Sequence, residues 1–160
     1  MSPILDVRNL QTHFFTKGGV LKAVDGVSFQ IRAGEIVGLV GESGSGKSIT
    51  GFSVLGLVDA PGRIVGGEIL FKGQDLTKLP ANEIQRMRGS RIAMIFQDPM
   101  MTLNPVLRIE TQMIEAIQTH DISVSKEEAR QRSRDALGLV GISSPEERMR
   151  AYPHQFSGGM

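Results

Sequence analysis

The sequence has no cysteine in its 160 residues, so disulfide bonds, thiolate metal sites and cysteine nucleophiles are excluded. This composition suits a reducing compartment. An excess of charge of one sign is missing as well, because 18 lysines and arginines offset 17 aspartates and glutamates. Such a balance gives no long-range attraction to nucleic acid or anionic lipid, and we expect no nucleic-acid partner.

Long apolar runs are also lacking. The longest candidates cover residues 36–40 and 54–58, and Gly56 interrupts the second. A membrane span needs about 20 apolar residues. No basic segment followed by an apolar stretch opens the sequence, so no secretory signal is expected. These absences predict a soluble, cytoplasmic chain, and its 40% apolar content suffices for one core of normal size.

The hydrophobic pattern predicts a strand-rich first part and a helical second part. Loose alternation and flanking glycine turns predict strands over residues 4–10, 23–31 and 67–73. Two continuous apolar stretches, at 36–40 and 91–96, predict strands that are buried on both faces.

Helical spacing predicts helices after residue 48, over 81–88, and from residue 109 onward. A capping-box pattern at Ser125 starts another helix, and Pro145 stands at the first position of the last one. The helix after Ser125 is expected to bury Ala129, Ala136, Leu137 and Val140. An α/β core over 1–97 and a helical subdomain over 98–160 follow from this pattern. A short basic stretch, Arg86, Arg88 and Arg91, is interpreted as a solvated face.

One octet matches the phosphate-binding pattern G-x-x-x-x-G-K-[ST] in full (the Walker A motif). Its residues are Gly41, Glu42, Ser43, Gly44, Ser45, Gly46, Lys47 and Ser48. Glycines allow the backbone N–H groups to point inward at phosphate oxygens, and the helix that follows adds its positive end. Lys47 supplies a charge to the β- and γ-phosphates, and the Ser48 hydroxyl is the expected Mg²⁺ ligand. Kinases, GTPases and transport ATPases all use this loop, so later motifs must select the class.

Two later features select among these classes. Gln97 ends the predicted strand at 91–96, and Ser157-Gly158-Gly159 follows the helical part. With the phosphate-binding loop, they resemble the ATP-binding subunits of ABC transporters over essentially all 160 residues. Phe156 and Met160 depart from the usual Leu-Ser-Gly-Gly-Gln signature, while its Ser-Gly-Gly core is intact. Residues 41–48, 95–105 and 152–160 most resemble the dipeptide, oligopeptide and nickel importer group.

The resemblance implies an α/β fold of the P-loop NTPase type: an ABC nucleotide-binding domain with an N-terminal antiparallel β part and a helical subdomain, truncated inside the signature. It implies ATP and Mg²⁺ as cofactors. The catalytic roles fall to Lys47 and Gln97, and the metal ligands are Ser48 and Gln97. The nucleotide-binding set adds Ile49, Ser157, Gly158, Gly159 and Phe14 as the adenine-stacking residue, with Phe15 as the one-residue alternative.

The same resemblance implies an ATP hydrolase that energises an importer for dipeptides, oligopeptides or nickel. Its partners would be transmembrane permease subunits, a second ATP-binding subunit and, indirectly, a substrate-binding protein. It would lie peripherally on the cytoplasmic face of the cell (inner) membrane. Met100, Met101 and Leu103 are equally candidate membrane-partner contacts and candidate core residues.

Other features of this family are expected beyond residue 160: an aspartate for Mg²⁺, a glutamate that activates water and a later histidine. His13 and His120 are interpreted as surface residues. We therefore predict that these 160 residues alone leave apolar surface uncovered, fold poorly and hydrolyse no ATP. Turnover above a Lys47→Ala control would refute this. The alternatives are a soluble ABC-type ATPase of translation or DNA repair, a P-loop kinase or GTPase, and a non-catalytic binding fragment.

Overall fold

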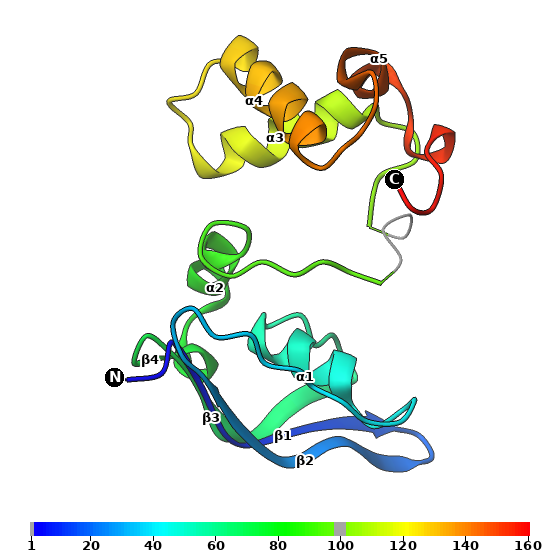
Figure 1. Ribbon diagram of the computed structural model, residues 1–160. Coiled ribbons are helices and arrows are strands. Elements are labelled where there is room, and N and C mark those ends of the chain that lie inside the picture. Colours follow the sequence, from blue (N-terminus) through cyan, green and yellow to red (C-terminus); the bar gives the residue numbers. More distant parts are fainter. Residues whose placement is uncertain (1, 98–101) are drawn as a thin grey trace. The chain divides into compact units, whose positions relative to one another are not determined.

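The computed structural model describes residues 2–97 and 102–160, which form two compact units (Figure 1). The first extends over Met1–Ala93 and the second over Met94–Met160. Each unit is described by itself. Within the described ranges, no helix is both long and apolar enough to cross a membrane.

A four-stranded antiparallel sheet organises the first unit. Its strands are β1 (Leu5–Thr16), β2 (Gly19–Ile31), β3 (Gly62–Phe71) and β4 (Gln74–Asp75), in the order β2-β1-β3-β4. The three strands predicted from the sequence are confirmed, and each begins or ends beyond its predicted limits. The hairpin between β1 and β2 explains part of the difference, because pairing continues to Thr16 opposite Gly19 at the glycine turn.

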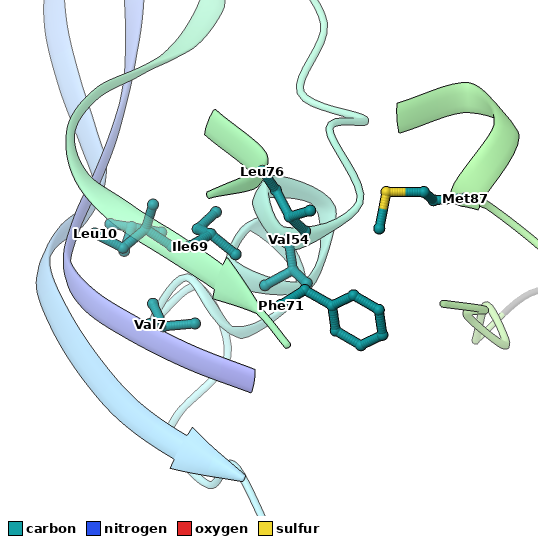
Figure 2. Packing of buried hydrophobic residues seen from close by; sticks show 8 residues of the cluster. Val7, Leu10, Val54, Ile69, Phe71, Leu76 and Met87 are labelled. Carbon is teal, nitrogen blue, oxygen red and sulfur yellow. The ribbon is translucent and has the colours of Figure 1, made fainter. Parts of the chain in front are cut away.

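Helix α1 (Lys47–Val54) lies over one face of this sheet (Figure 1). A 3₁₀ turn, η1 (Leu76–Lys78), and helix α2 (Ala81–Met87) follow the sheet in sequence. The core forms where these elements meet, and Figure 2 shows its side chains converging from β1, β3, α1 and the segment after β4. Its buried members are Val7, Leu10, Val24, Val54, Ile69, Phe71, Leu76 and Met87.

The two strands predicted to be buried on both faces are not formed. Residues 36–40 and 93–96 have no regular structure, and Ile36, Val40 and Ile95 are 98%, 90% and 98% exposed. A doubly buried strand needs a ladder partner on each edge and packing on each face. In the part of the chain the structure describes, neither stretch has such partners, and a single bridge between Arg88 and Ile92 is all that forms there. The expected uncovered apolar surface is therefore present at these two stretches.

The second unit consists of helices α3 (Ile109–His120), α4 (Lys126–Leu139) and α5 (Pro145–Arg150), followed by the 3₁₀ turn η3 (Pro153–Gln155). The predicted start of α4 is confirmed, because the Ser125 hydroxyl accepts a hydrogen bond from the Glu128 N–H at 3.1 Å. This bond satisfies one of the N–H groups that a helix start leaves without an intrahelical partner.

The buried face of α4 is narrower than predicted. Ala129 and Leu137 are buried, as expected, but Ala136 is exposed and Val140 is 73% exposed. The buried stripe advances in steps of four through Ser133, whose hydroxyl donates to the Ala129 carbonyl at 2.8 Å. Ala136, seven residues after Ala129, lies at the edge of this stripe, about 100° around the helix from Leu137. Val140 lies beyond the last helical residue.

Two small apolar clusters hold the helical unit together. One consists of Ile114, Val124 and Ala129, and joins α3 to the start of α4. The other consists of Leu137, Ile142 and Met149, with Met113 and Phe156 packed against it. Phe156 therefore connects the end of the described chain to the packed helices.

Candidate functional site: a phosphate-binding loop

The glycine-rich octet leads into α1, whose first two residues are Lys47 and Ser48, and Gly46 of the octet lies against β2. Gly46 is the N-cap of α1 and has a φ of +88°, a left-handed conformation that favours glycine. A Cβ added at Gly46 would overlap the backbone carbonyl oxygen of Ala23 in β2. Glycine is thus required here both for the turn and for the close approach of the loop to the sheet.

The loop presents backbone N–H groups at the start of α1. Within the described ranges, the N–H groups of Gly46, Lys47, Ser48 and Ile49 donate no hydrogen bond to the chain. The ladder of α1 starts with Thr50, whose N–H donates to the Gly46 carbonyl at 2.8 Å. Free donors at the positive end of a helix are suited to an anion.

The side chain of Lys47 folds back over the loop. Its Nζ donates to the Gly41 carbonyl at 2.8 Å, to the Glu42 carbonyl at 2.6 Å and to Ser45 Oγ at 3.3 Å. These contacts hold a positive charge beside the free N–H groups. Ser48 is exposed in the first turn of the same helix. The donor set therefore fits a polyphosphate.

Of the two predicted Mg²⁺ ligands, Ser48 belongs to this unit, and its role as a ligand stays a prediction. No cluster of three or more histidine, aspartate or glutamate side chains that could hold a metal occurs among the described residues. A Mg²⁺ at Ser48 would therefore be held mainly by phosphate oxygens and water, as this ion usually is. The predicted second ligand, Gln97, is exposed and belongs to the other unit. Its role as a metal ligand and catalytic residue stays a prediction.

Phe14 and Phe15 lie on opposite faces of β1. Thr12, two residues before Phe14, contacts α1 through Ser53 at 2.8 Å, so Phe14 shares the face that carries α1. Phe14 also packs against Gly62, where an added Cβ would lie 2.6 Å from the ring. Phe15 is 39% exposed, and the Arg63 guanidinium lies 4.2 Å above its ring. Of the two, Phe14 is on the same side of the sheet as the phosphate-binding loop.

The Ser-Gly-Gly segment forms an exposed turn at the end of the helical unit. The Met160 N–H donates to the Ser157 carbonyl at 2.9 Å, and Ser157, Gly158 and Gly159 are all exposed. Phe156, immediately before the turn, packs on the apolar cluster of Leu137, Ile142 and Met149. The turn therefore presents polar groups outward from a packed base, and its role toward a nucleotide stays a prediction.

Two side chains differ from their sequence-based interpretation. The His13 side chain is only 13% exposed and lies between β2 and β3, so the surface assignment is wrong for it. His120 is exposed, as expected. Arg88 is half-buried and bonded to backbone carbonyls, so it is no member of a solvated face. Its partners lie more than thirty residues away in the sequence, and local charge patterning carries no signal of such a contact.

Of the three candidate membrane-partner contacts, Met100 and Met101 lie outside the described residues. Leu103 is half-buried in the described part of the second unit.

A glycine loop that presents free N–H groups and a lysine before a helix defines a phosphate-binding protein of the P-loop class. The family described as ABC transporter matches residues 24–160. The chain therefore belongs to the ABC transporter family. Its structure is similar to the dimeric structure of MJ0796, a bacterial ABC transporter cassette, with a TM-score of 0.84 at 24% identity, over 97% of this chain and 64% of that one. At this identity, the similarity establishes the fold.

Several proteins are similar over nearly the whole chain. It is 50% identical over 161 residues to the oligopeptide transport ATP-binding protein AppD of Bacillus subtilis. It is 48% identical over 158 residues to the probable peptide ABC transporter ATP-binding protein y4tR of Sinorhizobium fredii, and 45% identical over 157 residues to the dipeptide transport ATP-binding protein DppD of Escherichia coli. The alignments cover 100%, 98% and 98% of this chain but only 49%, 47% and 48% of these relatives. The chain thus spans about half of their length.

Proposed function

We propose that this chain binds ATP through the Gly41–Ser48 loop and is part of an ATP-hydrolysing subunit that energises an ABC importer of dipeptides or oligopeptides. The observation that carries the proposal is the set of four free N–H groups at residues 46–49 beside the Lys47 ammonium group. Four free N–H donors beside an ammonium group attract negative charge, and a polyphosphate supplies that charge.

In this proposal each part of the site has one task. Lys47 leaves the carbonyls of Gly41 and Glu42 and binds phosphate oxygens, which neutralises part of their charge. The Ser48 hydroxyl would be a ligand of a Mg²⁺ that neutralises charge on the phosphate oxygens, and Gln97 is proposed as a second ligand. Phe14 stacks on the adenine from the same side of the sheet.

The printed names of similar proteins support peptide transport. Three relatives that match nearly the whole chain are named as peptide, oligopeptide and dipeptide transport ATP-binding proteins. From this we infer transmembrane permease subunits, a second ATP-binding subunit and an indirect substrate-binding protein as partners. The Ser157–Gly159 turn would contact the ATP held by the opposing subunit. The location would be peripheral, on the cytoplasmic face of the inner membrane.

ATP binding is tested with one lysine substitution and a matched control. In Lys47→Met we expect the Kd for MgATP, measured by equilibrium dialysis, to rise by on the order of a hundredfold, because a charge-assisted contact and a site charge are lost together. Lys17→Met removes an exposed lysine at the turn between β1 and β2 and should leave the Kd within about twofold. Equal affinity of the Lys47→Met variant and the wild type would contradict the proposal.

The transported substrate is tested separately from ATP binding. The chain, in the subunit and transporter to which it belongs, would be assayed for uptake of a labelled dipeptide, a labelled pentapeptide and labelled Ni²⁺ into cells. We expect peptide uptake that is lost in Lys47→Met. Uptake of Ni²⁺ alone would redirect the proposal to the nickel branch of the group. A Lys47-dependent ATPase without uptake of any of the three would favour the soluble ABC-type alternative.

A further inference from the structure

Arg88 is the C-cap residue of α2, and its side chain connects the end of α2 to the C-terminal end of α1. Its Nε donates to the Leu55 carbonyl at 2.8 Å, and its Nη2 donates to the Gly56 carbonyl at 2.5 Å. All of these residues belong to the first unit, whose internal arrangement the structure gives. Arg88 is half-buried, so its guanidinium is partly shielded from water.

The hydrogen bonds that end α1 use other carbonyls, so those of Leu55 and Gly56 accept from Arg88. The Leu57 N–H donates to the Phe52 carbonyl at 2.8 Å, and the Gly56 N–H donates to the Ser53 carbonyl at 3.1 Å. This pair of bonds, with Gly56 in the left-handed region at a φ of +62°, is a Schellman motif. The carbonyls of Leu55 and Gly56, the C-cap residue and the residue after it, accept from Arg88, and a cation at the negative end of the helix dipole is favourable.

Packing at this junction is close. A Cβ added at Gly56 would lie 3.1 Å from Ile84 Cγ2 and 3.4 Å from Arg88 Nη2, so α2 rests on the glycine. In the core, Val54 of α1 and Met87 of α2 belong to one buried cluster, and Figure 2 shows the Met87 side chain pointing toward Val54. The C-terminal end of α1 is therefore held by α2, while its N-terminal end is held against β2 at Gly46.

The residues after Arg88 form a tight turn rather than a free strand. The N–H groups of Arg91 and Ile92 both donate to the Met87 carbonyl, at 2.9 and 3.1 Å, and the Gly89 N–H donates to the Ile92 carbonyl at 2.9 Å. Ile92 packs against the core of the first unit. Arg88 thus stands at the fixed base of the segment that continues to Gln97.

We propose that Arg88 is a positioning residue for the phosphate-binding loop: by clamping the far end of α1 it fixes the direction in which the free N–H groups and Lys47 point. This inference rests on the proposed ATP binding. Arginine suits this position because its planar guanidinium presents Nε and Nη2 to the two carbonyls in a fixed geometry, whereas the lysine ammonium is a compact point charge on a flexible stem. Because Arg88 acts through α1, its loss should weaken the phosphate contacts and leave the adenine contact at Phe14 unchanged.

The test compares two ligands in four proteins. The complete subunit to which the chain belongs, and its variants Arg88→Met, Arg88→Lys and Arg86→Met, are titrated with MgATP and with adenosine, which lacks phosphates. In Arg88→Met we expect the Kd for MgATP to rise by on the order of tenfold and the Kd for adenosine to change by less than about twofold. Arg88→Lys should show the same selective effect in smaller degree. The control Arg86→Met removes an exposed arginine of the same helix and should match the wild type.

The outcomes separate this inference from the proposed function. A complete wild-type subunit that fails to bind MgATP would overturn both. If the wild type binds MgATP and Arg88→Met binds it equally well, the positioning role alone is overturned. An equal weakening of MgATP and adenosine would also overturn it, because a general loss of stability acts on both ligands. If Arg88→Met does not fold, as judged by circular dichroism, the same two Kd values of Arg88→Lys decide the question.

Discussion

The hydroxyl groups of Thr12 in β1 and Ser53 in α1 lie 2.8 Å apart in the interior of the first unit. Both side chains are buried, with 0% and 2% exposure. The Ser53 hydroxyl donates to the Ile49 carbonyl at 2.7 Å, so its single proton is used there. Thr12 must then be the donor in the pair, and the chain of bonds fixes α1 onto the sheet.

This direction of donation predicts unequal costs for the two single substitutions. Ser53→Ala leaves the Thr12 hydroxyl as a buried donor without an acceptor, and we expect a loss of about 2 kcal/mol in the free energy of unfolding. Thr12→Val keeps the shape and the Ser53–Ile49 bond, so about 1 kcal/mol is expected. The double variant should cost less than the sum, because it removes both polar groups. Urea unfolding of the wild type, the two single variants and the double variant gives the four free energies of this double-mutant cycle. Strict additivity of the two single losses would contradict the hydrogen bond between Thr12 and Ser53.

Two glycines of the loop should respond differently to alanine. Gly44 and Gly46 both have left-handed φ values, +81° and +88°. A Cβ at Gly44 meets nothing within 4 Å, so Gly44→Ala should cost only the backbone strain of about 1 kcal/mol. At Gly46 the same methyl overlaps the Ala23 carbonyl, so α1 must move away from β2.

We therefore expect Gly46→Ala to lose more stability than Gly44→Ala, by at least about 2 kcal/mol, and to bind MgATP more weakly. Urea unfolding and equilibrium dialysis on both variants check the order. The reverse order of stability, with Gly44→Ala the more damaged, would show that the loop does not rest on β2 in this way.

Sequence patterns predicted well those elements whose partners lie nearby in the chain. The hairpin of β1 and β2, the capped start of α4 and the glycine loop before α1 all depend on local turns and caps, which particular residues encode. The stretches 36–40 and 91–96 failed because a doubly buried strand depends on neighbours far away in sequence. The apolar residues are present, but the described residues include no neighbouring strand with which these stretches form a ladder of backbone hydrogen bonds.

The site shows the same division. The loop residues from Gly41 to Ser48 could be predicted because their spacing itself sets the geometry of the N–H groups. Arg88 could not, since its carbonyl partners belong to residues 55 and 56 and nothing in its local sequence marks them. The burial of His13 was missed for a similar reason, because it results from pairing with strands on both sides of β1.

The two neighbouring phenylalanines of β1 separate the adenine contact from a surface contact. We expect Phe14→Ala to raise the Kd for MgATP by on the order of tenfold, because a stacking surface is lost. Phe15→Ala is the matched control. It removes the ring under Arg63 on the opposite face and should leave the Kd within about twofold. If Phe15→Ala weakens binding and Phe14→Ala does not, the assignment moves by one residue.

The helical unit has its own charged connection, which centres on Arg130 of α4. Its guanidinium donates a hydrogen bond to Glu146 of α5, and its Nε lies 3.6 Å from a carboxylate oxygen of Glu110 in α3. Arg150 lies 3.3 Å from the same Glu146 oxygen. The hydrogen bond from Arg130 holds the pKa of Glu146 below its usual value. The three helices on which the Ser157–Gly159 turn is based are thus joined by charges as well as by apolar packing.

A lowered carboxylate pKa makes the stability of the helical unit depend on pH in a definite direction. A glutamate whose pKa is lower in the folded than in the unfolded state contributes its full stabilisation above the unfolded value of about 4.3, and loses it as the pH falls through the folded value. Arg130→Met removes the cause of the shift. We therefore expect the urea midpoint of the wild type, followed by circular dichroism, to fall more steeply between about pH 5 and pH 3 than that of Arg130→Met. Arg134→Met, which alters an exposed arginine of the same helix, should keep the wild-type slope. Parallel slopes for the wild type and Arg130→Met would mean that Glu146 and Arg130 do not pair in solution, and α5 would then be joined to α4 by apolar contacts rather than by this ion pair.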